Sequence, residues 1–274
     1  DTDRATVTAV SGAPTVAVFV DPAGDDADPG TEVLPVRTLG RALEVAGQEN
    51  LSEIRLAAGT YAEEAFDYVV DATLRITGAG ADVTELDAGD ADLFTLQAAD
   101  GAEDPVALYL QDVTLTTTGT AVSVPSDTEA HLLRVTCAGA SPCVRAAELF
   151  GFLPAPGGTF TFRNGTAVAD GSGTAFTVAG SAHLVQDSRI EGYATGVFAF
   201  GSAFRLEGVT LDGNGVGLEA TGSIDVDGDG DVDPLVARGS TFVSNGTGIV
   251  AQGAQLRVTD TEIEGSDAHG LHLE

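Results

Sequence analysis

The chain has 274 residues, of which 42 are acidic and 12 are basic, so its formal net charge is −30 at pH 7. A surface this acidic repels nucleic acid and anionic membranes, and we expect no nucleic-acid partner. No apolar run approaches the ~20 residues that cross a bilayer, so we expect no membrane insertion.

Composition also indicates the compartment. The sequence contains no methionine, even at its first position, which predicts a processed chain that has lost a signal peptide. Cys137 and Cys143 lie six residues apart, and we expect a small disulfide loop between them. A metal site is disfavoured because no second cysteine pair accompanies them. Both features predict a secreted protein, extracellular or at the cell surface.

The beginning of the chain predicts an arm and a cap. Residues 1–16 read as a β-rich arm, and residues 17–62 read as a strand followed by a short amphipathic helix. A solenoid needs such a cover, because an open end exposes strand edges and core. The apolar positions of the expected helix are Val36, Leu39, Leu43 and Ala46.

Three motifs follow one another in residues 18–62: a D-x-x-G-x-D-x-x-P-G-T loop, a P-x-x-T-L-x-x-A-L helix and a φ-x-φ-x-x-G-x-Y strand. The matching residues are Asp21, Gly24, Asp26, Pro29, Gly30, Thr31, Pro35, Thr38, Leu39, Ala42, Leu43, Ile54, Leu56, Gly59 and Tyr61. This segment resembles the opening of right-handed parallel β-helix proteins of the pectin-lyase-like superfamily. That superfamily contains polysaccharide lyases, hydrolases and esterases but also adhesins, so the resemblance implies a fold and leaves the function open.

An internal repeat organises residues 63–274. Similar segments begin at residues 120, 142, 174, 195, 216, 247 and 269, which gives a period of 21–22 residues with two longer steps. Each repeat contains three short runs in which apolar residues alternate with others, and alternation indicates strands with one buried face. Three strands per repeat fit one coil of a parallel β-helix. A leucine-rich repeat is the rival, but its spaced leucines and asparagines are missing.

Aligned repeats assign the faces of the first strand in each coil. Two columns point inward. The first is Val122, Val144, Phe176, Val197, Leu218, Ile249 and Leu271, and the second is Val124, Ala146, Val178, Ala199, Ala220, Ala251 and Leu273. A further column of Ile190, Leu211, Phe242 and Ile263 is expected in another strand. We therefore predict an all-β, single right-handed parallel β-helix with an N-terminal capping helix.

The two longer steps place insertions at residues 148–158 and 224–234. The first is apolar and rich in proline, and it predicts a packed surface loop, with a partner contact as the alternative. The second carries aspartate at alternate positions and resembles the calcium loops of dockerin and thrombospondin type 3 repeats. The aspartates are Asp225, Asp227, Asp229, Asp231 and Asp233.

Calcium prefers six to eight oxygen ligands, and five neighbouring carboxylates would repel one another without a cation. We therefore expect a structural calcium ion in this loop, with a solvated acidic loop as the alternative. An EF-hand would place a bidentate glutamate at the twelfth position, which is Val236 here. The loop is thus no EF-hand.

The outward columns of the first strand contain few groups suited to catalysis. Glu219 has no second carboxylate facing it, as glycoside hydrolysis requires, and Arg145 is the only arginine in these columns. Phe198, Phe200 and Val250 form an apolar patch that suits a surface contact, although aromatic residues also bind sugars.

The sequence as a whole therefore favours a non-catalytic extracellular structural or adhesive protein. The given sequence stops partway through a coil, which the arm or cap of a second copy would complete. We therefore expect end-to-end self-association into a filament, with missing residues or a monomer with a frayed last coil as the alternatives. The alternative is a carbohydrate-active enzyme, a polysaccharide lyase or hydrolase, or a carbohydrate-binding protein.

Overall fold

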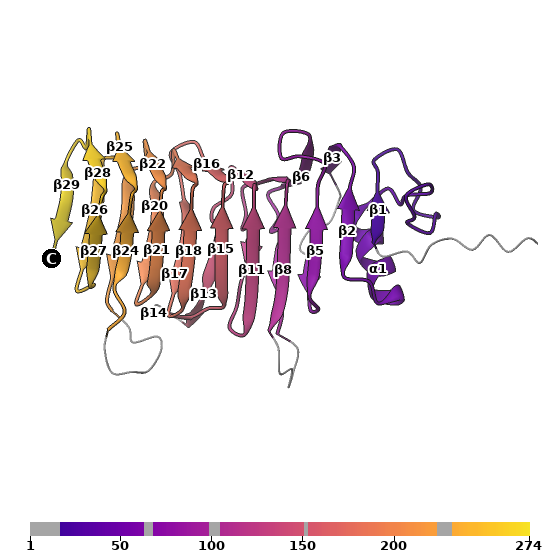
Figure 1. Ribbon diagram of the computed structural model, residues 1–274, viewed down its shortest axis with the longest axis horizontal. Helices are drawn as coiled ribbons and strands as arrows, with labels where there is room; N and C mark the ends of the chain where they lie inside the picture. The colour runs from indigo at the N-terminus through magenta and orange to yellow at the C-terminus, as the bar shows by residue number, and fades with distance from the viewer. Residues whose placement is uncertain (1–16, 63–67, 99–104, 151–152, 224–231) are drawn as a thin grey trace, which may run out of the picture.

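The computed structural model describes residues 17–62, 68–98, 105–150, 153–223 and 232–274. The chain winds into a right-handed parallel β-helix, as predicted, and its coils stack into an elongated rod (Figure 1). Each coil contributes one strand to each of three sheets, here called A, B and C, in the order C, A, B along the chain. Neighbouring coils pair in parallel and in register.

Sheet A faces the viewer in Figure 1 and begins with the first strand of the described chain. Its strands are β1 (Val18–Val20), β2 (Glu53–Leu56), β5 (Leu74–Thr77), β8 (Val106–Gln111), β11 (Thr128–Leu133), β15 (Thr159–Arg163), β18 (Ala182–Gln186), β21 (Ala203–Glu207), β24 (Leu235–Arg238) and β27 (Leu256–Thr259). Sheet B contains β3 (Gly59–Ala62), β6 (Thr84–Gly89), β9 (Thr114–Thr117), β12 (Thr136–Ala138), β16 (Thr166–Val168), β19 (Arg189–Glu191), β22 (Thr210–Asp212), β25 (Thr241–Val243) and β28 (Glu262–Glu264). Sheet C contains β4 (Tyr68–Val70), β7 (Phe94–Leu96), β10 (Val122–Ser123), β13 (Val144–Phe150), β17 (Thr174–Ala179), β20 (Thr195–Phe200), β23 (Val216–Thr221), β26 (Thr247–Gln252) and β29 (His269–Leu273).

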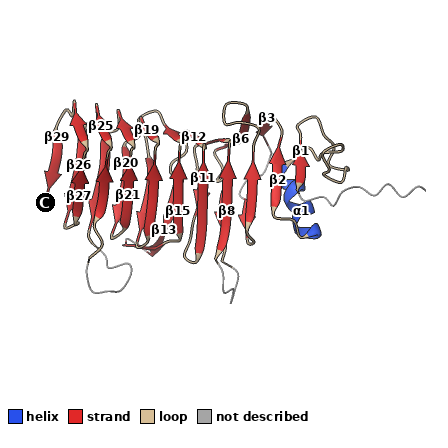
Figure 2. Ribbon diagram, in the orientation of Figure 1, coloured by secondary structure: helices blue, strands red, loops and turns tan. Residues whose placement is uncertain are grey.

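The helix α1 (Leu39–Glu49) lies at the N-terminal end of the rod (Figure 2). Thr38 caps its N-terminus, and the Thr38 hydroxyl accepts a hydrogen bond from the N–H of Arg41. Asp26 in the preceding loop accepts hydrogen bonds from the N–H groups of Arg37 and Thr38. Burial alone would raise the pKa of Asp26, but these N–H groups lower it. The predicted helix cap is confirmed, and its buried residues are Leu39, Ala42, Val45 and Ala46.

The loop and strand motifs of this region hold the cap in place. Gly24 leaves no room for a side chain, because a Cβ there would lie 2.4 Å from the carbonyl oxygen of Pro35. The Tyr61 hydroxyl donates toward the carbonyl oxygens of Val20 and Ala57, which ties the first coil to the strand before the helix. These motif residues therefore hold backbone in place.

The inward columns predicted from the repeats are confirmed. Val122 pairs with Val144, and the column continues through β17, β20, β23 and β26 to Leu271 in β29. Ile190, Leu211, Phe242 and Ile263 likewise stack in sheet B. In the last strand, the inward Leu271 and Leu273 remain 47% and 65% exposed.

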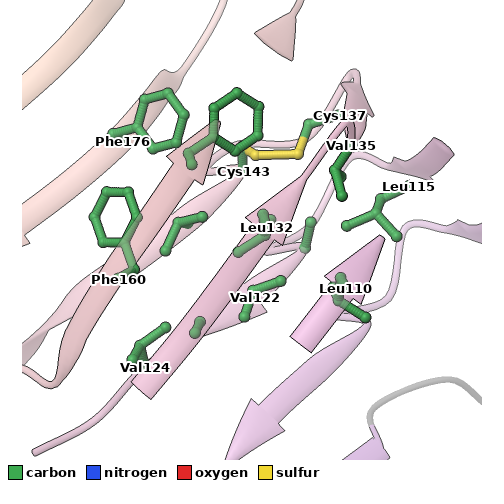
Figure 3. Packing of buried hydrophobic residues seen from close by; sticks show 14 of the residues in the cluster. Leu110, Leu115, Val122, Val124, Leu132, Val135, Cys137, Cys143, Phe160 and Phe176 are labelled. Atoms are coloured by element: carbon green, nitrogen blue, oxygen red, sulfur yellow. A yellow bond between two sulfur atoms is a disulfide. The ribbon is translucent and has the colours of Figure 1, made fainter. Parts of the chain in front are cut away.

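The core is a single continuous apolar cluster inside the three sheets. Figure 3 shows it near the middle of the rod, where the rings of Phe160 and Phe176 stack with centroids 5.6 Å apart. Cys137 and Cys143 form a disulfide that crosses the corner between sheets B and C. Both cysteines are fully buried.

Left-handed residues turn the chain at the corners of the coil. From β8 onward, the residues with positive φ between sheets A and B are Asp112, Arg134, Asn164, Asp187, Gly208, Gly239 and Asp260. Aspartate, asparagine and glycine adopt this conformation most readily, which explains their regular spacing in the sequence.

Two equivalent corner glycines provide a stability test. Gly192 and Gly213 both turn the chain from sheet B to sheet C and have φ of 73° and 62°. A Cβ on Gly192 would lie 2.4 Å from the carbonyl oxygen of Ala169, whereas a Cβ on Gly213 would meet no atom within 4 Å. We expect Gly213→Ala to cost about 1 kcal/mol, the usual penalty for a left-handed alanine. Gly192→Ala should cost at least about twice as much, since the backbone must also shift. Urea unfolding of both variants measures this, and equal losses would contradict the packing at Gly192.

The insertion at residues 148–158 is a β-hairpin rather than an irregular loop. β13 runs on beyond its partners, and β14 (Leu153–Pro156) pairs with it antiparallel, with Ala147 opposite Pro156. The two prolines of β14 are compatible with an edge strand, because such a strand has one side without hydrogen-bonded neighbours.

Candidate functional site

Half of the basic residues of the chain lie on the outer face of sheet A. The chain has 12 basic residues, all of them arginine. Six arginines alternate with inward residues on strands of this sheet, and all six are exposed. They are Arg55, Arg75, Arg163, Arg205, Arg238 and Arg257. A chain of net charge −30 thus concentrates positive charge on one side.

Most of these six arginines are not neutralised by the many carboxylates of the chain. Arg55 forms an ion pair with Glu53 at 2.7 Å. The other five form none within the described ranges. Among the described arginines outside sheet A, Arg41, Arg134 and Arg189 form ion pairs, whereas Arg37 and Arg145 form none. The unpaired guanidinium groups of sheet A therefore remain available to an anionic ligand.

Arg75, Tyr109, His131 and Thr161 form a straight outward column across β5, β8, β11 and β15. The Arg75 guanidinium lies over the Tyr109 ring, with its Cζ 4.7 Å from the ring centroid. The rings of Tyr109 and His131 stack with centroids 4.7 Å apart and planes 20° apart. This row combines a cation with two aromatic faces.

Hydrogen bonds fix the histidine in this row. His131 Nδ1 lies 3.0 Å from the Thr161 hydroxyl, and Nε2 lies 3.3 Å from a carboxylate oxygen of Glu129. His131 and Thr161 line a hollow of about 220 Å³. Arg163, two residues after Thr161 on β15, also lines it. The hollow is thus bounded by an arginine on each side and carries Tyr109 and His131 between them.

Asp112 acts on this site from the neighbouring corner. It accepts hydrogen bonds from Arg134 at 2.6 and 2.8 Å and from the amide of Gln111, which borders the hollow. The hydrogen bonds from Arg134 lower the pKa of Asp112. Asp112 is therefore a carboxylate that orients Gln111.

The chemistry of the hollow suits recognition of an acidic sugar. Aromatic faces pack against the apolar faces of sugar rings, and guanidinium groups bind carboxylate or sulfate groups in a fork. In the described part of the chain, no group of three histidine, cysteine, aspartate or glutamate residues could hold a metal ion. The same residues include no helix that is long and apolar enough for a membrane span.

The site residues predicted from the sequence lie elsewhere. Phe198, Phe200 and Val250 are half-buried on the outer face of sheet C, and Glu219 stands between Phe198 and Val250 in one column. Arg145 occupies the same outer column, nearer the N-terminus. That Phe198, Phe200 and Val250 form a surface contact stays a prediction.

The predicted calcium loop lies mostly outside the described residues. Asp225, Asp227, Asp229 and Asp231 belong to residues 224–231, and only Asp233, just before β24, is described. The arm at residues 1–16 also lies outside the described ranges.

Comparisons with known proteins extend the description of the fold. A family model described as "Protein of unknown function (DUF1565)" matches residues 22–87, which include the cap and the following strands as far as β6. No curated protein matches the chain. Among solved structures, a rhamnogalacturonan lyase is similar with a TM-score of 0.60 at 12% identity, over 87% of this chain and 74% of the lyase.

Two further structures are similar at low TM-scores. The A-module of a mannuronan C-5 epimerase from Azotobacter vinelandii has a TM-score of 0.27 at 12% identity, over 85% of this chain and 91% of the module. Tailspike protein 3 of bacteriophage CBA120 has a TM-score of 0.28 at 13% identity, over 93% of this chain and 59% of the tailspike chain. At such identities the likeness concerns the fold alone.

Proposed function

We propose that this chain is an adhesive protein that binds an acidic polysaccharide through the outer face of sheet A. The observation that carries the proposal is the row of Arg75, Tyr109 and His131, with Arg163 beside it, in a chain otherwise dominated by carboxylates. The fold of the chain, which it shares with a rhamnogalacturonan lyase, supports an elongated surface for a polymer.

Electrostatics favours an acidic polymer over a neutral one. A neutral sugar would stack on Tyr109 but would leave the guanidinium groups of Arg75 and Arg163 without a charged partner. A carboxylate or sulfate group provides that partner in a charge-assisted hydrogen bond. The surrounding negative charge of the molecule opposes non-specific binding of polyanions, so binding depends on the local arginines.

Binding to immobilised polygalacturonate, a sulfated dextran and neutral dextran tests the proposal. We expect the wild-type protein to bind the two acidic polymers, and the double variant Arg75→Gln/Arg163→Gln to bind at least about ten-fold more weakly. Arg145→Gln is the control, because it removes an arginine from sheet C. Equal binding of all three proteins to polygalacturonate and to neutral dextran would reject the proposal.

Catalysis is the second candidate, and the same polymers test it. If the wild-type protein shortens polygalacturonate and Arg145→Gln or Glu219→Gln does not, an active site lies on sheet C and the non-catalytic role is contradicted.

Structural calcium, secretion and end-to-end self-association stay predictions. Electron microscopy with and without calcium tests the last of these, and discrete monomers at high concentration would contradict it.

A further inference from the structure

Three arginines gather on the C-terminal half of the outer face of sheet A. Arg205 of β21 pairs with Val236 of β24, which pairs with Arg257 of β27. Arg238 lies on the middle strand, two residues after Val236. We call Arg205, Arg238 and Arg257 the arginine triad. Its members surround a hollow of about 470 Å³, which Glu207, Thr259 and Asp260 also line.

The described residues that line the hollow carry more positive than negative charge. Within the described residues, none of the three guanidinium groups forms an ion pair, although Glu207 lies beside Arg238 in the register. Three cations against two carboxylates leave one net positive charge around the hollow. Mutual repulsion of the cations is relieved when an anion binds between them.

The triad lies in line with the first site. The column that contains Tyr109, His131 and Thr161 continues through Leu184 to Arg205 and on to Arg257. Thr161 and Arg205 are two coils apart, which is about 10 Å at the usual spacing of strands. One extended polymer on this face would therefore meet the first site and the triad together.

We propose that the arginine triad is a second anion site, which binds a carboxylate or sulfate group of the same polysaccharide molecule. This inference rests on the proposed function. Two sites on one rigid rod bind a polymer with a high effective concentration at the second site, whereas a ligand too short to span them gains nothing. The triad thus makes binding depend on ligand length.

Titrations with a short and a long ligand test the triad. Galacturonate disaccharide and polygalacturonate are compared on the wild-type protein, the double variant Arg238→Gln/Arg257→Gln and Tyr109→Ala. Arg145→Gln is the control for the loss of an arginine outside sheet A. We expect the triad variant to bind the polymer about ten-fold more weakly or worse, while its affinity for the disaccharide stays unchanged. Tyr109→Ala should weaken both ligands.

The outcomes separate the two proposals. If the triad variant binds the polymer like the wild type while Tyr109→Ala does not, the second site is rejected and the proposed function stands. If polymer binding falls in the triad variant but not in Tyr109→Ala, the triad is supported and the first site is rejected. If neither variant changes binding, both are rejected.

A sulfated dextran in place of polygalacturonate distinguishes the anionic groups. A greater loss in the triad variant with the sulfated polymer identifies sulfate as the preferred group, and a greater loss with polygalacturonate identifies carboxylate. Competition by inorganic sulfate should weaken polymer binding more in the wild-type protein than in the triad variant. Equal competition in both proteins at constant ionic strength would contradict an anion site at the triad.

Discussion

Replacement of His183 by phenylalanine should make the protein markedly more resistant to acid. His183 in β18 points into the core between Phe160 and Phe204 of the neighbouring coils, with ring centroids 5.0 and 6.3 Å away. Neither ring nitrogen has a hydrogen-bond partner in the described structure. Burial lowers the pKa of His183 from 6.5 to about 3.

The sign of the effect follows from the protons bound in each state. As the pH falls through 6.5, the unfolded chain protonates His183, but the folded chain does so only near pH 3. Between these values the unfolded state binds more protons, and the free energy of unfolding falls by about 1.4 kcal/mol for each pH unit. The wild-type protein therefore has its full free energy of unfolding above pH 6.5 and loses part of it as the pH falls toward 3. His183→Phe has no ionisable group at this position, so its free energy of unfolding does not fall for this reason.

Urea unfolding from pH 7 to pH 4 measures the effect. The difference in unfolding free energy between His183→Phe and the wild type should grow as the pH falls, and the variant should already be more stable at pH 7 by about 1 kcal/mol, because two unpartnered ring nitrogens leave the core. His269→Gln, at an exposed histidine of β29, is the control for the loss of a histidine outside the core. Parallel curves for His183→Phe and the wild type would show that the buried ring takes up a proton without unfolding.

Replacement of Asn245 by alanine should destabilise the C-terminal coils by about 3 kcal/mol or more. Asn245 is completely buried. Its side-chain oxygen accepts hydrogen bonds from the backbone N–H and the side-chain amide of Asn214, at 2.9 and 3.0 Å. Its amide donates to the carbonyl oxygen of Leu211 at 2.9 Å. Alanine leaves these buried groups of Asn214 and Leu211 short of partners.

Asn164 supplies the control, because it also begins an Asn-Gly-Thr triplet. It is exposed and has a φ of 51°, a conformation that glycine adopts easily. Asn164→Gly should therefore change stability little, whereas Asn245→Ala should lower the melting temperature by roughly 10 °C. Equal melting temperatures for the two variants would mean that water or a shifted backbone satisfies the groups that Asn245 binds.

The buried half of the architecture could be predicted from the sequence for a physical reason. Parallel coils place equivalent residues above one another, so every inward position repeats its apolar character at each turn, as Val197, Leu218 and Ile249 do. The corners repeat their left-handed residues in the same way. The cap was predicted from the resemblance of residues 18–62 to pectin-lyase-like β-helix proteins and from an amphipathic pattern. In the structure, Asp26 and Thr38 accept hydrogen bonds from the first N–H groups of the helix and the residues before it.

The candidate site was missed because the prediction aligned the strands of sheet C. Three segments of variable length lie between a sheet C strand and the sheet A strand that follows: residues 97–105, 151–158 and 222–234. Because of these segments, an alignment based on the strands of sheet C puts the strands of sheet A out of register. Without the correct register, the outward residues Arg75 and His131 cannot be recognised as neighbours and look like ordinary solvated residues. Counting back from each left-handed corner residue, such as Asp112 or Arg134, restores the alignment and brings Tyr109 beside His131.

Residue-for-residue pairing between coils has a consequence for ligand spacing. Arg163 and Arg205 lie on strands that are separated by one intervening strand of sheet A, β18, so their separation along the axis of the rod is a whole number of rungs. Adding or deleting one coil between them would change that distance by about 4.8 Å and would leave each set of side chains as it is. The number of coils between the two groups of arginines therefore sets the spacing of anionic groups in a polymer that can contact both of them.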